Sequence, residues 1–239
     1  MVQPNLEKAL MTKEHMGNYN LWIYKKVSSF LGKRVLDIGS GTGTIIELMY
    51  DIHRTIFATD IFENKLDIMR KRFKSQPNIT VKKFNISTDS VDNFLTKDID
   101  TITCINVLEH IEDDLGALEN FKKIIVRNGK IVIFVPAYQF LFGTMDKNTG
   151  HYRRYNPKVL GNMGKKLGLK TIHNSHMNFI GTFPWFLNGK ILKKTKPYSE
   201  VLGQGKIKIY DRIIPLFEGL ERIVPIPFGL SEIIVFQKD

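Results

Sequence analysis

Three glycines at alternate positions, Gly39, Gly41 and Gly43, are the residues of this 239-residue chain that most directly suggest chemistry. They follow an apolar run, Arg34–Ile38, and precede a segment with the apolar spacing of a helix. Glycine lets the backbone turn tightly and approach a ligand, because no Cβ stands in the way. Such a turn between a strand and a helix N-terminus predicts a nucleotide-binding site.

Two carboxylates stand beside this turn. Asp37 precedes the first glycine by two residues, and Asp60 follows the next apolar run, residues 55–59. An acid at the carboxyl end of a parallel strand can accept hydrogen bonds from ribose hydroxyls. A carboxylate at position 37 would repel a pyrophosphate. It therefore disfavours the dinucleotide of a dehydrogenase and favours a ligand that carries an amino group or a sulfonium.

Residues 35–43 resemble the first motif of class I S-adenosylmethionine-dependent methyltransferases, (V/L)-L-(D/E)-x-G-x-G-x-G. Residues 84–86, Phe-Asn-Ile, and 106–111, Asn-Val-Leu-Glu-His-Ile, match later motifs of that family. Asn85 replaces a usual acid, and its carbonyl oxygen can still accept a hydrogen bond from adenine. The resemblance implies S-adenosyl-L-methionine as cofactor and S-adenosyl-L-homocysteine as product. The implied cofactor contacts are Asp37, Gly39, Gly41, Gly43, Asp60, Ile61, Asn85, Ile86, Asn106 and Val107.

A second polar run, residues 146–155, reads D-K-N-T-G-H-Y-R-R-Y. It resembles a subgroup of small methyltransferases with the pattern D-x-x-x-G-H-x-R-R-Y, which is linked to glycan, lipid or secondary-metabolite pathways. His151 offers a base that titrates near neutral pH. Arg153 or Arg154 offers a planar fork for a carboxylate or phosphate. The alternative is a structural knot in which Asp146 pairs with an arginine.

Methyl transfer from a sulfonium requires the protein to position the acceptor and to remove its proton. We therefore expect His110 or His151 to be the base for a hydroxyl or amine acceptor. No pair of histidines has a metal-ligand spacing, and the single Cys104 excludes a cysteine cluster, so no metal site is predicted. The residues expected to contact the substrate are Tyr19, Tyr138, Arg153, Arg154 and Tyr155.

Charge is distributed unevenly along the chain, which carries a net +11. Residues 1–150 hold 20 basic and 18 acidic residues, whereas residues 151–239 hold 15 and 6. The positive C-terminal part would attract an anionic acceptor, an anionic lipid surface or nucleic acid. Residues 207–223, together with Trp185 and the lysines of 190–196, could lie on a bilayer or form a cap helix packed on the core, and we favour the cap.

Alternating strand and helix patterns predict one Rossmann-like α/β domain over residues 1–239. We expect a seven-stranded, mostly parallel sheet with helices on both faces and an antiparallel last strand. Residues 1–31 would form a helical lid, with Tyr19 covering the cofactor, and residues 181–228 a helical cap on the substrate side. No apolar run is long enough to span a membrane, and no signal pattern occurs, which favours a cytoplasmic protein that is peripheral at the membrane if at all.

These observations favour a methyltransferase that acts on an oxygen or nitrogen atom of a small-molecule, sugar or lipid-linked acceptor. An RNA methyltransferase is the second hypothesis. The basic C-terminal part supports it, and the lack of an N-P-P-Y motif or a separate RNA-binding module opposes it. A third hypothesis is a subunit that binds the cofactor without turnover and scaffolds a partner.

Overall fold

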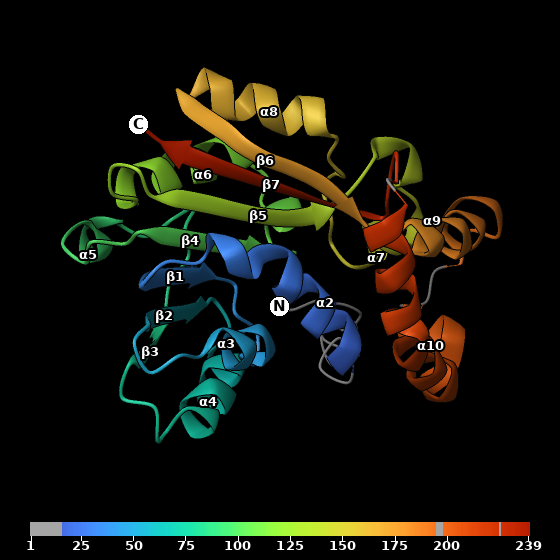
Figure 1. The fold of residues 1–239 in the computed structure, drawn as a ribbon, viewed down its shortest axis with the longest axis horizontal. Coiled ribbons are helices and arrows are strands. Elements are labelled where there is room, and N and C mark those ends of the chain that lie inside the picture. Colours follow the sequence, from blue (N-terminus) through green and yellow to red (C-terminus); the bar gives the residue numbers. More distant parts are fainter. Residues whose placement is uncertain (1–15, 195–197, 225) are drawn as a thin grey trace.

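The computed structural model describes residues 16–194, 198–224 and 226–239. Its centre is a seven-stranded sheet of order β3-β2-β1-β4-β5-β7-β6 (Figure 1). All neighbouring strands are parallel except β7, which runs antiparallel to both β5 and β6. The predicted Rossmann-like sheet with an antiparallel last strand is confirmed. The strands are β1 (Arg34–Ile38), β2 (Thr55–Asp60), β3 (Ile79–Lys83), β4 (Thr101–Ile105), β5 (Lys130–Pro136), β6 (Leu169–Met177) and β7 (Ser231–Lys238).

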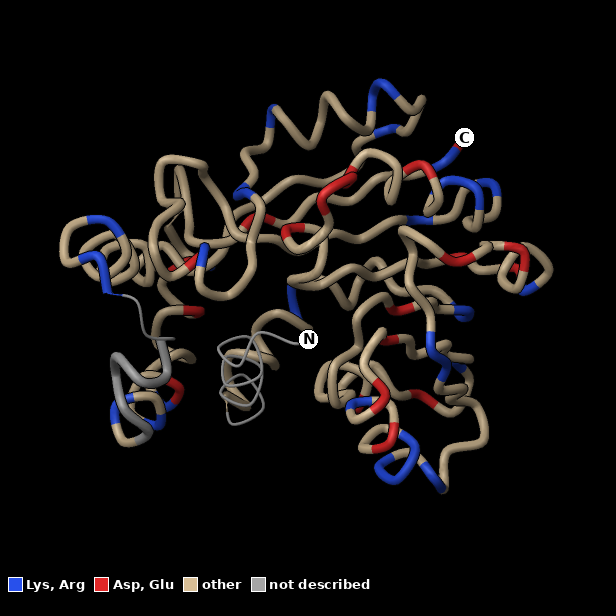
Figure 2. The backbone as a smooth tube through the Cα atoms, turned by 180° about the vertical axis from the view of Figure 1, so that it is seen from behind, with Lys and Arg blue, Asp and Glu red and all other residues tan. Residues whose placement is uncertain are grey.

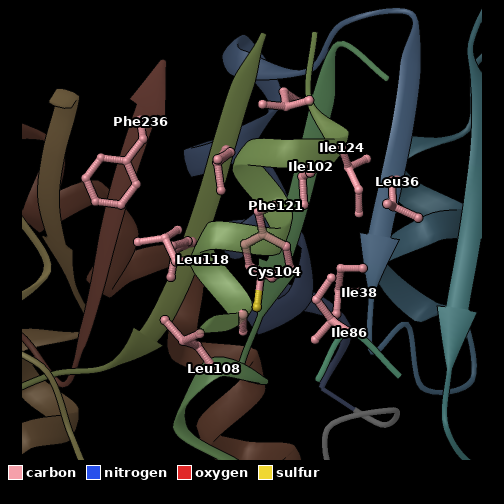
Figure 3. Close-up of a cluster of buried hydrophobic side chains, with 14 of the residues drawn as sticks. Leu36, Ile38, Ile86, Ile102, Cys104, Leu108, Leu118, Phe121, Ile124 and Phe236 are labelled. Atoms are coloured by element: carbon pink, nitrogen blue, oxygen red, sulfur yellow. The ribbon is translucent and has the colours of Figure 1, made fainter. Parts of the chain in front are cut away.

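Helices cover both faces of the sheet. One buried apolar cluster joins the sheet to α5, α6 and α8, and the other joins it to α2, α3, α4 and α10. In the first cluster, Leu118 and Phe121 of α6 lie over Ile102 and Cys104 of β4 (Figure 3). The helices are α2 (Gly17–Val27), α3 (Thr44–Met49), α4 (Glu63–Arg72), α5 (Asp92–Leu95), α6 (Asp114–Ile124), α7 (Thr144–Asn148), α8 (Pro157–Lys166), α9 (Phe179–Phe186) and α10 (Tyr198–Ile223).

The central strands β2, β1, β4, β5 and β7 are buried along almost their whole length because both faces of the sheet are covered, whereas the edge strands β3 and β6 are mostly exposed or half-buried. Every residue of β5 except the first is buried, and its sequence is a continuous apolar run without alternation. This is the pattern expected for a parallel strand between two helix layers. The register places Asp37 level with Ala58 of β2 and Thr103 of β4, so the acid lies in the middle of the sheet.

The segment predicted as a cap is helical and lies beyond the carboxyl ends of β4 and β5 (Figure 1). It consists of α9, a π-helical turn η4 (Leu187–Ile191), and α10. α10 is one helix of 26 residues that continues through Pro215 and Gly219, and it contains the helix expected over residues 207–223. Of the predicted lid, residues 1–15 lie outside the described residues, and the rest is α2 and the 3-10 turn η1 (Ser28–Phe30).

Candidate functional site

The glycine turn leaves the carboxyl end of β1 and begins α3. Gly39, Gly41 and Gly43 have φ values of 70°, 60° and 86°, which L-residues with a side chain rarely adopt. A Cβ at Gly39 would lie 2.4 Å from Cγ2 of Val107, and a Cβ at Gly43 would lie 2.5 Å from the Phe73 ring. The turn therefore needs glycine both for its backbone angles and for close packing.

Asp60 is tied to the glycine turn. Its Oδ2 accepts a hydrogen bond from the Gly41 backbone N–H at 2.9 Å, and its Oδ1 accepts one from the Phe62 N–H at 2.9 Å. Burial raises the pKa of Asp60, against the lowering effect of these backbone donors. The carboxylate thus fixes the turn at the same edge where a ribose would be bound.

Asp37 is buried between β2 and β4 and accepts a short hydrogen bond from the Thr103 hydroxyl. Burial raises the pKa of Asp37 to about 6, and the nearby charge of Asp60 adds to the increase. A buried carboxylate with this pKa is ionised at neutral pH and attracts a positively charged ligand group.

A cavity of about 720 Å³ opens beside these residues. Nine of the ten predicted cofactor contacts line it; Gly43 does not, and acts instead as the N-cap of α3. The side-chain oxygen of Asn85 already accepts a hydrogen bond from the Ser87 N–H at 3.0 Å, so adenine would have to use its second lone pair. Sequence reasoning missed Asn20 on α2 and Lys65 on α4, which also line the cavity and belong to none of the motifs.

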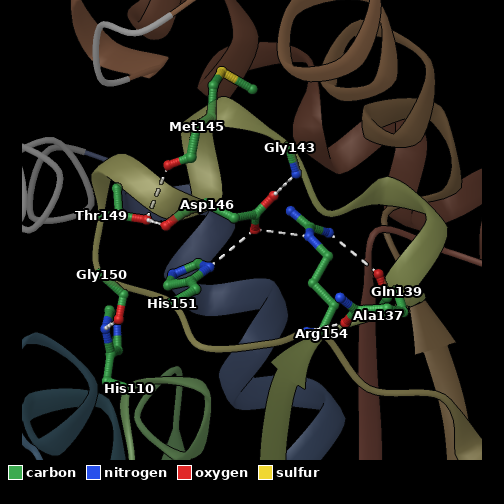
Figure 4. A network of polar contacts seen from close by, with 10 residues as sticks. All are labelled: His110, Ala137, Gln139, Gly143, Met145, Asp146, Thr149, Gly150, His151 and Arg154. Carbon is green, nitrogen blue, oxygen red and sulfur yellow. Dashed lines mark hydrogen bonds and ion pairs between the residues drawn. The ribbon is translucent and has the colours of Figure 1, made fainter. Parts of the chain in front are cut away.

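The cavity is also lined by His110, Thr149, Gly150 and Tyr152. His110 Nδ1 lies 3.3 Å from the Gly150 carbonyl oxygen, and its ring meets the His151 ring edge to face at 4.7 Å. The sequence separates these two histidines by 41 positions, and the fold brings them together (Figure 4). His151 is not itself among the cavity-lining residues, although both of its chain neighbours are.

Asp146 is the centre of a buried polar network (Figure 4). Its Oδ1 accepts hydrogen bonds from Nδ1 of His151 at 2.9 Å and from Nε of Arg154 at 2.7 Å, and its Oδ2 accepts one from the Gly143 N–H at 2.9 Å. Burial alone would raise the pKa of Asp146, but the hydrogen bond from His151 and the positive charge of Arg154 hold it below its ordinary value. The network orients His151.

Arg154 and Tyr155 are both buried, and both have partners within the protein. The Arg154 side chain is 1% exposed, paired with Asp146 and stacked 4.7 Å from the Trp185 ring. The Tyr155 hydroxyl donates to the Asp114 carboxylate at 2.8 Å, and its ring is buried in the core. Neither residue lines the cavity, and their assignment as substrate contacts stays a prediction.

The other predicted substrate contacts also lie outside the cavity lining. Arg153 pairs with Asp114 at 2.7 Å and donates to the Glu112 carbonyl oxygen. The Tyr138 hydroxyl lies 3.1 Å from Nε2 of His176. Burial raises the pKa of Tyr19 above its ordinary value, and hydrogen bonds with Ser231 and Asn178 offset only part of this increase. Tyr19 and Tyr138 therefore lie toward the β6–β7 side of the strand ends.

Metal ligation was not expected from the sequence, since no local spacing suggests it. The fold nevertheless brings together Glu109, His110 and His151, whose potential ligand atoms lie within 4.8 Å of one another. The positive charge of buried Arg154 also acts on Glu109. The cluster can thus hold a proton or a cation, and chelation distinguishes the two.

The sheet order, the glycine turn and the acid at the end of β2 define the class I methyltransferase architecture. The chain belongs to the methyltransferase domain family whose model matches residues 14–174, so it is an S-adenosylmethionine-dependent methyltransferase. It is 24% identical over 161 residues to the ubiquinone biosynthesis O-methyltransferase of Pseudomonas fluorescens. The aligned region covers 62% of this chain and 68% of that enzyme. It is 26% identical to the mitochondrial counterpart in Schizosaccharomyces pombe over 46% of this chain and 40% of that one.

Solved structures share the fold. A SAM-dependent methyltransferase from Archaeoglobus fulgidus has a TM-score of 0.59 at 20% identity, covering 92% of this chain and 93% of that one. Phosphoethanolamine N-methyltransferase 2 of Haemonchus contortus, in complex with S-adenosyl-L-methionine, has a TM-score of 0.60 at 18% identity, covering 92% and 52%. The family rules out the dehydrogenase hypothesis for the glycine turn. When bound, the cofactor supplies an activated methyl group, and the cavity-lining residues Asp37, Asp60 and Gly41 would hold it.

The raised pKa of Asp37 predicts that cofactor affinity depends on pH. At pH 5 a carboxyl with a pKa of about 6 is about nine-tenths protonated. If the ionised form binds the positive cofactor group, affinity for S-adenosylhomocysteine falls about tenfold from pH 7 to pH 5. Isothermal titration calorimetry across this range would measure it. Asp37→Asn serves as the control, with weaker and nearly pH-independent binding, and an unchanged wild-type affinity would contradict the role of Asp37.

Proposed function

We propose that this methyltransferase transfers the methyl group to an oxygen or nitrogen atom of a small-molecule, sugar or lipid-linked acceptor. The observation that carries the proposal is that a single cavity extends from the glycine turn to His110. A side chain able to accept a proton therefore lines the same cavity as the glycine turn. Relatives named for O-methylation and N-methylation of small molecules support the same acceptor class.

His110 is the residue that we assign to proton removal. The Gly150 carbonyl oxygen can only accept a hydrogen bond, so Nδ1 of His110 carries the hydrogen and Nε2 of the neutral ring carries the lone pair. His151 packs against this ring and is oriented by Asp146. We assign His151 and Asp146 a positioning role, in which they fix the His110 ring and stabilise it after it gains a proton.

The experiment that tests this function follows labelled methyl from S-adenosylmethionine into a fractionated extract of the source cell. Organic-phase lipids, small aqueous solutes, RNA and protein are separated and counted. Label among lipids or small solutes, absent with a His110→Ala control, supports the proposal and identifies the acceptor source. Label in RNA that disappears at high salt would instead establish the RNA hypothesis. Bound cofactor with no label in any fraction would favour the scaffold.

A further inference from the structure

Exposed apolar side chains gather on the cap. Of the twenty large hydrophobic residues that are exposed in the described ranges, eleven lie between positions 183 and 224. Single exposed apolar residues are ordinary, but a concentrated group marks a surface that is covered by something else. The eleven are Phe183, Phe186, Leu187, Ile191, Leu192, Ile209, Ile213, Leu216, Leu220, Ile223 and Val224.

α10 has two apolar faces. One face packs on the protein: Ile207 and Ile214 are buried, and Tyr210 and Phe217 join the same cluster with α2. The other face carries residues at positions 209, 213, 216, 220 and 223, the spacing of one helical stripe, and these are 39–80% exposed. A helix that merely capped the core would need only the first face.

Three acidic side chains in the described part of α10, residues 205–223, make contacts within the protein. Asp211 accepts hydrogen bonds from the backbone N–H groups of Asn18 and Tyr19, at the start of α2. Glu221 accepts from the N–H groups of Asn178 and Phe179, at the start of α9. Glu218 pairs with Lys25 at 3.0 Å. Over residues 205–223, these pairings leave the exposed side of α10 with little negative charge.

The basic side chains of α10 lie on its exposed side. Lys206, Lys208 and Arg212 are exposed near the beginning of the stripe, and Arg222 is exposed near its end. Figure 2 shows basic residues on the cap elements at this end of the molecule. The apolar stripe is therefore bordered by positive charge, which is the pattern of a helix that lies on an anionic membrane surface.

The preceding segment repeats this pattern. Phe183, Phe186, Leu187 and Ile191 form an exposed stripe along α9 and η4, next to the exposed Lys190, Lys193 and Lys194. Trp185, which the sequence suggested as a bilayer contact, turns inward and stacks on Arg154. Two separate elements at the same end of the fold thus combine exposed apolar residues with lysines (Figure 1).

We propose that the outer faces of α9, η4 and α10 bind the surface of an anionic lipid bilayer. No helix among the described residues is long and apolar enough to cross a membrane, so the contact would be interfacial. A second copy of the chain is the other candidate occupant. A twofold contact through these faces would place their lysines against the same lysines, whereas anionic headgroups would neutralise them.

The test is co-sedimentation of the full chain with vesicles of phosphatidylcholine, with and without phosphatidylglycerol, in the absence of cofactor. We expect binding to the anionic vesicles only and loss of binding at high salt. The double variant Leu216→Glu/Leu220→Glu should lower the partition coefficient at least about tenfold. The matched control Ile52→Glu/Ile68→Glu also replaces two exposed aliphatic side chains by glutamate, but at positions away from the cap. This control should bind vesicles like the wild type.

Circular dichroism and binding of S-adenosylhomocysteine show whether each variant is folded. A folded Leu216→Glu/Leu220→Glu variant that binds anionic vesicles like the wild type would overturn the proposal. The proposal would also be overturned if the wild-type protein does not bind these vesicles and is a dimer in sedimentation, while the variant is a monomer. The occupant of the surface would then be a second copy of the chain. Because the assay needs no turnover, failure here leaves the proposed function unaffected.

Discussion

Replacing His110 by alanine is expected to lower kcat by about 10²–10⁴-fold, the usual cost of losing a general base. His110 lines the cavity and is held by the Gly150 carbonyl, so its loss removes the proton acceptor without removing the cofactor site. Affinity for S-adenosylhomocysteine should therefore stay close to that of the wild type. The measurement is steady-state kinetics with the acceptor found by label transfer, together with calorimetry for the cofactor.

His151→Ala is the matched comparison for this prediction. It should cost less than His110→Ala, because His151 lies behind the cavity lining, and it should also shift the pH profile of kcat through its contact with the His110 ring. If His151→Ala has the larger effect, the two roles are exchanged. If both variants keep more than about a tenth of kcat, positioning alone drives the transfer.

Chelation separates proton transfer from metal activation at the Glu109, His110 and His151 cluster. We expect dialysis against a chelator to leave kcat unchanged, because the charge of Arg154 already acts on Glu109. Loss of activity on chelation, restored by Zn²⁺ or Mn²⁺, would contradict the base assignment. It would make the two histidines metal ligands, since a carboxylate and two imidazoles suit such ions.

Arg154→Met is expected to lower the free energy of unfolding by about 3–5 kcal/mol, because it leaves the buried Asp146 charge without its closest cation. The side chain also donates to the Ala137 carbonyl oxygen, which would lose that donor. Urea denaturation monitored by fluorescence measures the change. Stability that depends on ionised Asp146 should also fall as pH decreases through the lowered pKa of that group.

The neighbouring Arg153→Met is the control. Arg153 also forms an ion pair, with Asp114, but its side chain is 33% exposed, so we expect a change of at most about 1 kcal/mol. If Arg154→Met is as stable as Arg153→Met and instead raises the KM for an anionic acceptor, Arg154 contacts the acceptor as the sequence predicted. The pair of variants thus distinguishes a structural arginine from a binding arginine.

The sequence by itself determined the fold and many of the residues that line the cavity. Strand and helix patterns are local, and these lining residues follow directly from strand ends: Gly39 and Gly41 after β1, Asp60 at the end of β2, and Asn106 after β4. Because parallel strands end at one edge of a sheet, residues at their ends must meet there, and their spacing in the sequence is enough to identify them.

Only the tertiary structure decided the direction of the side chains in residues 146–155. The sequence shows two adjacent arginines, but not that Arg154 is buried against Asp146 while Arg153 pairs with Asp114 near the surface. The outer face of α10 is a similar case, because both of its faces are apolar in sequence and only packing against α2 shows which one remains exposed. The partner that a side chain contacts depends on residues that are distant in the sequence, and local sequence patterns do not identify those residues.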